Sequence, residues 1–293
     1  MGQKDLAAKD LESRPEVFAD IINAFIYGGE EVVLPEHLKP APTETLYEST
    51  YETLRNQYND VSKYEMAGQK IKIQYVLENE SNKNYRLILR KAGYEGAIYR
   101  SEYEEKQVYP VIVLVLYWGK KKWKPCSSLY DFFETGHIAE PLSQYIDNIK
   151  LHMFSMAHLP KCIRKNFRSD LRIVVDYLAE GADYEPTSQK IKYVEPVMRL
   201  LYALTGEKEF LNSIAELKVK QERGGATMCE VVDKFVARGV EQGIQQGLRN
   251  GARAFVEASI SRGAAADYIL EMVQQCFGFT RENADELYRE CML

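Results

Sequence analysis

Residues 70–80 read Lys-Ile-Lys-Ile-Gln-Tyr-Val-Leu-Glu-Asn-Glu, and this stretch decides the fold. Polar and apolar side chains alternate over its first half, as they do in a strand with one buried face. The stretch then becomes apolar and ends on Glu78 and Glu80. Residues 58–65 have a similar strand-like pattern, and Ala67-Gly68 supplies a turn between the two segments. They are therefore predicted to form a β-hairpin whose second strand enters a core.

A second stretch, residues 111–118, predicts the centre of the sheet. It reads Val-Ile-Val-Leu-Val-Leu-Tyr-Trp and is bounded by Pro110 and Gly119. An unbroken apolar run of this kind is typical of a strand that is buried on both faces. Residues 83–104 favour a helix before this strand, and residues 149–154 favour a further short strand.

Helical patterns occupy both ends of the chain. Ser13 and Pro15 can begin a helix whose apolar residues recur up to Phe25, and the pattern is helical again from residue 166 onward. Early strands and late helices together predict an α/β fold with a helical C-terminal region. We expect a core over residues 1–180, a helical extension and hinge over 181–226, and a separate tail over 227–293.

The tail contains glycines at every fourth position. Each glycine costs a helix about 1 kcal/mol relative to alanine, so close packing of a second helix along the stripe is the simplest compensation. The partner is either the same helix of another subunit, which gives a homodimer, or a helix of the same chain. Two short amphipathic helices are predicted after the stripe, at about 264–276 and 281–291. The stripe glycines are Gly239, Gly243, Gly247 and Gly251.

Composition limits the classes of function that the protein can have. The 293 residues carry a net charge of −5, which argues against binding to nucleic acid through bulk positive charge but does not exclude a carboxylate-based nuclease. No apolar run approaches the roughly 20 residues of a membrane span, and no secretory signal begins the sequence. The five cysteines form no metal-binding or disulfide pattern, which favours a reducing cytoplasm.

Three acids form the sharpest candidate site. Glu78 and Glu80 lie two residues apart and so face the same side of a strand, and Asp60 can meet them if the hairpin pairs. Convergent carboxylates are oxygen ligands for Mg²⁺ or Mn²⁺, and such a site can activate water for phosphodiester hydrolysis. The alternative is a solvated end of a hairpin that happens to be acidic.

Basic residues flank these acids in the sequence. Arg86, Arg90 and Lys91 follow at helical spacing, and Lys121 and Lys122 come directly after the predicted central strand. They could contact the phosphates of double-stranded DNA beside a metal. A solvated helix face or loop is the alternative for each group.

The order and spacing of several motifs resemble the family of recombination-promoting nucleases (Rpn), whose relatives are called YhgA-like transposases. The resemblance implies a PD-(D/E)XK nuclease core, as in restriction endonucleases, and a metal-dependent DNA endonuclease linked to recombination, mobile DNA or phage defence. It also implies that Asp60 and Glu78 are metal ligands and that Asp20, on the first helix, is an accessory acid. The matching motifs lie at residues 18–24, 59–61, 75–81, 85–87, 93–100, 109–119 and 169–177 and in the glycine repeat.

Glu80 departs from the family pattern, which usually has Gln at this position, or Lys in the wider superfamily. A glutamate could ligate a second metal or act as a general base instead. Two hypotheses therefore stand. One is an active Mg²⁺- or Mn²⁺-dependent endonuclease, and the other is a catalytically silent protein on a nuclease fold that binds DNA or oligomerises.

Overall fold

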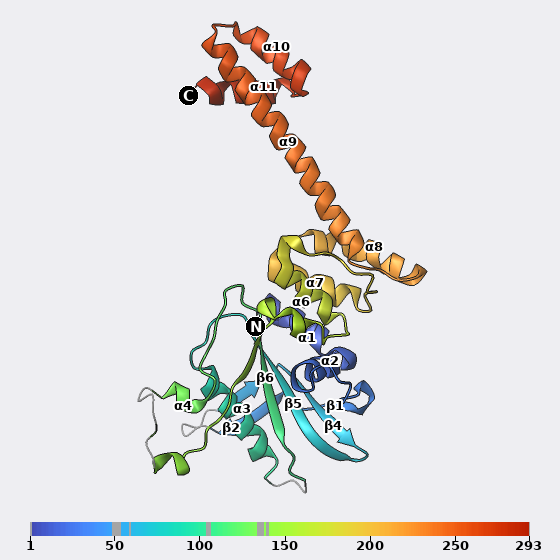
Figure 1. Cartoon of the computed structure of the whole chain (residues 1–293), viewed down its shortest axis with the longest axis vertical. Coiled ribbons are helices and arrows are strands. Elements are labelled where there is room, and N and C mark those ends of the chain that lie inside the picture. Colours follow the sequence, from blue (N-terminus) through green and yellow to red (C-terminus); the bar gives the residue numbers. More distant parts are fainter. Residues whose placement is uncertain are drawn as a thin grey trace. The chain divides into compact units, whose positions relative to one another are not determined.

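The computed structural model describes residues 2–48, 54–58, 60–103, 107–133, 138 and 141–292. The chain divides into two compact units, Met1–Met228 and Cys229–Leu293. The first unit contains the sheet, and the second is entirely helical where it is described (Figure 1).

A mixed five-stranded sheet with the order β1-β4-β5-β6-β7 forms the centre of the first unit. β1, β4 and β5 pair antiparallel, whereas β5, β6 and β7 pair parallel. The predicted hairpin and central strand are confirmed as β4-β5 and β6, although residue 59 lies outside the described residues. The strands are β1 (Leu38–Pro40), β4 (Val61–Ala67), β5 (Lys70–Glu80), β6 (Val111–Tyr117) and β7 (His152–Ser155).

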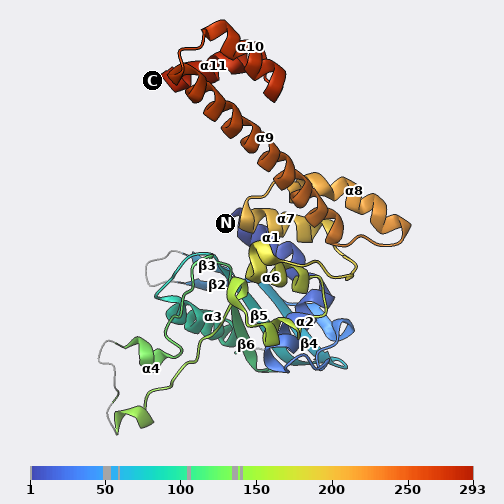
Figure 2. The same cartoon turned by 45° about the horizontal axis from the view of Figure 1, so that its top comes forward.

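The side chains of β5 and β6 alternate between the two faces of the sheet, and each face is covered by helices. Val76 and Val113 face α3 (Leu87–Ser101), which connects β5 to β6 and contacts them through Ile98. Asn79, on the opposite face, contacts α1 (Gln3–Glu12). α2 (Pro15–Ile26) lies beside α1 on that second face (Figure 2). The fold is therefore a mixed α/β sheet flanked by helices, as expected.

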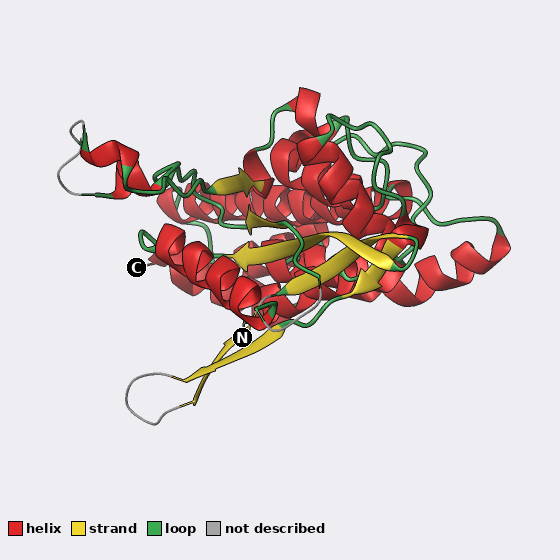
Figure 3. Cartoon of the chain, turned by 90° about the horizontal axis from the view of Figure 1, so that it is seen from below, coloured by secondary structure: helices red, strands yellow, loops and turns green. Residues whose placement is uncertain are grey.

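A separate two-stranded antiparallel sheet, β2 (Glu44–Glu48) and β3 (Leu54–Tyr58), extends from the first unit (Figure 3). The sequence did not predict it. Nor did it predict α1: Ser13, expected to cap the next helix, instead ends α1, and Arg14 precedes α2.

The remaining helices of the first unit follow β7, apart from the short α4 (Leu129–Phe132) before it. α7 packs against both α1 and α8, so the segment 181–226 lies within the first unit. Four 3-10 turns, Pro35–His37, Leu142–Gln144, Met156–His158 and Gly181–Asp183, complete this unit. The helices after β7 are α5 (Lys161–Arg164), α6 (Leu171–Glu180), α7 (Val194–Thr205) and α8 (Glu209–Arg223).

The second unit consists of α9 (Cys229–Ser261), α10 (Ala266–Phe277) and α11 (Arg281–Met292), close to the helices predicted for the tail. A small core joins the three, formed by Val256 of α9, Ile269 of α10, Leu287 of α11 and their neighbours. Between Val231 and Ala252 no residue of α9 is buried. In the part of the chain that the structure describes, no helix is both long and apolar enough to cross a bilayer.

Candidate active site

The pairing of β4 with β5 brings Asp60 and Glu78 together at one edge of the sheet. Val61 opposes Leu77, so Asp60, just before β4, lies beside the end of β5. The Asp60 backbone N–H donates to Glu78 Oε1 at 3.3 Å, and the Asn79 backbone N–H donates to Asp60 Oδ2 at 2.6 Å. The predicted meeting of these two acids at the sheet edge therefore occurs.

Glu80 joins the same cluster through Arg90 of α3. Glu78 and Glu80 point to the α3 face, where the Arg90 guanidinium is paired with Glu80 and lies 3.7 Å from Glu78. Arg90 also donates to the Tyr94 hydroxyl at 2.8 Å. We define Asp60, Glu78 and Glu80 as the carboxylate cluster. One arginine thus spans two of its three acids.

Burial makes the charged forms of both glutamates in the cluster costly. Burial, and then the charge of Asp60, raise the pKa of Glu78 to about 8, against a lowering by Arg90. Burial also raises the pKa of Glu80, and Arg90 again opposes the shift. Glu78 is only 2% exposed, so its ionised form needs a positive partner.

Helix α1 contributes two residues that the sequence did not single out. Lys9 Nζ lies 2.7 Å from Asp60 Oδ1. Glu12 is fully buried, and its Oε2 accepts from Asn79 Nδ2 at 2.7 Å. Asn79 Oδ1 in turn accepts from the indole N–H of Trp118 at 2.6 Å. A buried chain of side chains therefore connects Trp118, Asn79 and Glu12 behind Asp60.

Glu12 is a buried acid that is only partly satisfied by hydrogen bonds. Its Oε1 is buried and has no hydrogen-bond partner among the described residues. Burial is the main cause that raises the pKa of Glu12 to about 8, and the charge of Asp60 adds to it. The sequence holds one hint of this contact. Asn79 is a polar residue on the strand face opposite the two glutamates, so it needs a buried polar partner such as Glu12.

A metal site built from three acids is not preformed. Within the described ranges, no three His, Cys, Asp or Glu side chains are grouped so that they could hold a metal ion. The physical reason is that Glu80 turns to Arg90 and Asp60 turns to Lys9. The chemistry of the three donors, which are all carboxylate oxygens, nevertheless suits a hard divalent cation.

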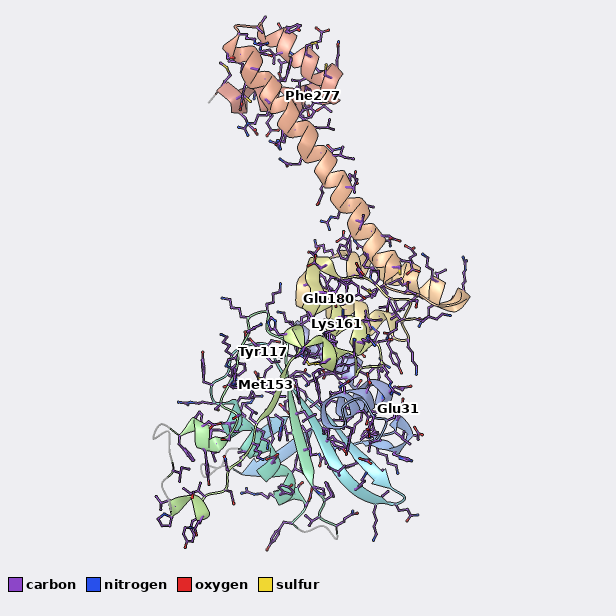
Figure 4. All side chains as sticks on the ribbon, viewed as in Figure 1. Glu31, Tyr117, Met153, Lys161, Glu180 and Phe277 are labelled. Atoms are coloured by element: carbon purple, nitrogen blue, oxygen red, sulfur yellow. The ribbon has the colours of Figure 1, made fainter. Side chains whose placement is uncertain are left out.

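The predicted DNA-contacting residues separate into two groups. Arg86 is exposed at the start of α3, and Lys121 and Lys122 are exposed just after β6. Glu80 opposes Tyr117, so both strands end at the same edge of the sheet; Figure 4 marks Tyr117. Lys91 differs: it is buried and paired with Glu95 at 2.5 Å, so its predicted phosphate contact does not fit its position.

Asp20 is not brought to the carboxylate cluster. Its carboxylate accepts from the backbone N–H groups of Arg168, at 3.0 Å, and Ser169, at 2.8 Å. It lies at a pocket of about 400 Å³ lined by α2, by the segments 29–35 and 189–193 and by residues 168–170, without any member of the cluster. Burial raises the pKa of Asp20. The accessory role that the family resemblance implied does not fit this position, because Asp20 holds a loop.

Comparison with known proteins identifies the segment that carries the cluster. The family model described as "Putative transposase, YhgA-like" matches residues 43–183, which include the carboxylate cluster, Arg90 and Lys121. No curated protein and no solved structure matches the chain. The family whose model matches residues 43–183 is thus the one that the sequence resembles.

Proposed function

We propose that the protein is a metal-dependent DNA endonuclease that hydrolyses phosphodiester bonds. The observation that carries this proposal is the contact between Asp60 and Glu78 at the end of β5, with Glu80 two residues further on. The order of secondary structure also suits a PD-(D/E)XK core, because an antiparallel hairpin carries the acids and a helix then leads to a parallel strand.

Asp60, Glu78 and Glu80 would hold Mg²⁺ or Mn²⁺, with Lys9 and Arg90 giving up their present pairing. When bound, such an ion lowers the pKa of water and neutralises charge on a phosphodiester. The chain's own residues contribute in other ways. The Asn79 N–H keeps Asp60 beside Glu78, and Glu80 is the candidate general base that orients or deprotonates water.

Double-stranded DNA would reach this edge through its phosphates. Arg86 lies one helical turn before Arg90, and Lys121 and Lys122 lie beyond the neighbouring strand at the same edge. These local charges can serve a chain whose net charge is −5. The family name supports a setting in recombination or mobile DNA, and phage defence is a further setting. A reducing cytoplasm is the location that we propose, since no disulfide is recorded among the cysteines of the described residues.

A second candidate function is a catalytically silent protein that binds DNA or oligomerises. The observation that favours it is the pairing of all three acids with Lys9 and Arg90, which neutralises the cluster without a metal. The presence of Glu80, where the family usually has Gln, also supports this second candidate.

We also propose a homodimer formed through α9. A Cβ added at Gly239, Gly243 or Gly247 would meet nothing within 4 Å, whereas one at Gly251 would lie 3.2 Å from the Phe277 ring of α10. The first three glycines of the stripe are therefore open to a closely packed helix. Val240 and Ile244 beside it are both 57% exposed. A second copy of α9 would cover the glycines and this apolar ridge together.

Incubation of the purified protein with supercoiled plasmid and Mg²⁺ or Mn²⁺ tests the endonuclease proposal. We expect nicked and linear products from the wild type and none from Glu78→Ala. Glu65→Gln is a matched control, since Glu65 is equally buried on the same hairpin but lies near its other end, paired with Lys72. Absence of cleavage by the wild type under these conditions would favour the silent candidate. Equal cleavage by Glu78→Ala would place the activity outside the cluster.

A further inference from the structure

Tyr85 holds an aromatic ring in solvent beside the carboxylate cluster. It is 70% exposed, although it lies just before α3 and next to a hydrophobic cluster that contains Leu87 and Trp123. Its ring meets Trp123 edge to face, with centroids 6.3 Å apart and an interplanar angle of 77°. In this geometry Trp123 covers at most one face of the tyrosine ring. The other face remains available to a flat ligand.

The Trp123 ring that contacts Tyr85 is buried. Trp123 packs in turn against Tyr117, the last residue of β6, with centroids 5.1 Å apart. The Tyr117 hydroxyl donates to the Lys121 backbone carbonyl at 3.1 Å. The ring of Tyr85 and the basic loop that contains Lys121 and Lys122 are therefore both fixed to the end of one strand. That end lies opposite Glu80 in the parallel register.

The charge around Tyr85 suits a nucleic acid. Arg86 follows it directly, and Lys121 and Lys122 lie two residues or fewer from Trp123. All three are exposed, and the part of the chain that the structure describes gives none of them an ion pair. An exposed aromatic ring bordered by cations is the arrangement with which proteins bind an unpaired base and its phosphates.

We propose that Tyr85 stacks on an unpaired nucleobase while Arg86, Lys121 and Lys122 contact the adjoining phosphates. This inference rests on the proposed function, because it assigns the substrate of the same site: DNA with a single-stranded segment, such as a frayed end or a flap. A paired base in an intact duplex has both faces covered by its neighbours and cannot take this position. A protein partner would instead need an extended apolar patch, whereas cations surround this ring.

Binding can be measured apart from cleavage, in EDTA, by fluorescence anisotropy of a labelled 15-nucleotide single strand. We expect Tyr85→Ala to bind about tenfold more weakly than the wild type, the order of a single base–aromatic stack. Tyr85→Phe should bind like the wild type, because it keeps the ring. Tyr103→Ala is the matched control: Tyr103 is 87% exposed just beyond the C-terminal end of α3, whereas Tyr85 lies just before the N-terminal end of that helix.

A strand whose central nucleotides lack bases supplies the second measurement. The wild type should lose affinity for it, whereas Tyr85→Ala should not distinguish it from the intact strand. Equal binding of the intact strand by Tyr85→Ala and the wild type would overturn the proposal, as would no binding by the wild type. An equal loss for a blunt duplex and for the single strand would also overturn it. Plasmid cleavage that depends on Glu78 could still occur in each of these cases, so the two proposals fail separately.

Discussion

The backbone N–H of Asn79 donates a 2.6 Å hydrogen bond to the carboxylate of Asp60, on the neighbouring strand. Strand pairing therefore places Asp60 beside Glu78, whereas the Asn79 side chain points to the other face and bonds to Glu12. The two faces of β5 therefore have different roles. One face carries Glu78 and Glu80, and the other holds the strand in place through the bond between Asn79 and Glu12.

The raised pKa of Glu78 makes stability depend on pH. Its pKa is about 8 in the folded chain against 4.5 as the ordinary value, so the unfolded state ionises first as pH rises. Stability should therefore fall from about pH 4.5 to about pH 8, and Glu78 should account for roughly 2–3 kcal/mol of the part above pH 6. Urea unfolding in EDTA measures this. Glu78→Gln should lose less stability over that range, and Glu65→Gln should behave like the wild type. An equal loss in Glu78→Gln would contradict the assignment.

Removal of the Glu12 side chain should destabilise the first unit. Glu12→Ala leaves the Asn79 amide without its acceptor and opens a cavity beneath α1, so we expect a loss of roughly 2–4 kcal/mol of unfolding free energy. Glu12→Gln keeps an acceptor and should cost about 1 kcal/mol or less. Tryptophan emission should also shift in Glu12→Ala, because the Trp118 indole bonds to Asn79. Equal stability of the two variants would show that the chain of side chains is not coupled.

Asp20→Asn should affect stability but not metal binding. The change weakens charge-assisted bonds to two backbone N–H groups, which predicts a loss of about 1–3 kcal/mol in urea unfolding. Its Mn²⁺ affinity, measured on the folded protein, should match that of the wild type. A large fall in Mn²⁺ affinity with unchanged stability would restore Asp20 to the catalytic role.

A large side chain introduced into the glycine stripe of α9 should disrupt the proposed dimer. If two subunits pack along it, Gly243→Leu should convert a dimer into a monomer in light scattering at concentrations well above micromolar. Gln245→Ala, an exposed change on the same helix outside the stripe, should leave the dimer intact. A wild type that is already monomeric would refute the dimer. Gly243→Ala should then simply stabilise the free helix, by about 1 kcal/mol.

Local patterns predicted the sheet well, because alternation in residues 70–80 and the apolar run at 111–118 are properties of neighbouring residues. α1 was missed, because its buried residues are only Ala8, Leu11 and Glu12 and it is stabilised by packing against α7, about 180 residues away. The β2-β3 hairpin was missed as well.

The sequence predicts those residues of the site that strand pairing brings together. It does not predict the residues that a helix distant in sequence contributes. Asp60 and Glu78 follow from the hairpin, but Lys9 and Glu12 reach it only through the packing of α1. The burial of Lys91, by contrast, can be predicted from the sequence. The buried residues of α3, Leu87, Ile88, Lys91, Tyr94 and Ile98, share one helical stripe, so their periodicity already places Lys91 with the core rather than with DNA.

Mn²⁺ binding tests most directly whether the carboxylate cluster is a metal site. Electron paramagnetic resonance of free Mn²⁺, titrated against the full chain at pH 8, measures it without a DNA substrate. The metal-site proposal predicts saturable binding to the wild type and to Glu65→Gln, and binding at least tenfold weaker in both Asp60→Asn and Glu78→Gln. A wild type that leaves Mn²⁺ free, or that binds it no better than these two variants, would contradict the proposal and leave a cluster neutralised by Lys9 and Arg90 alone.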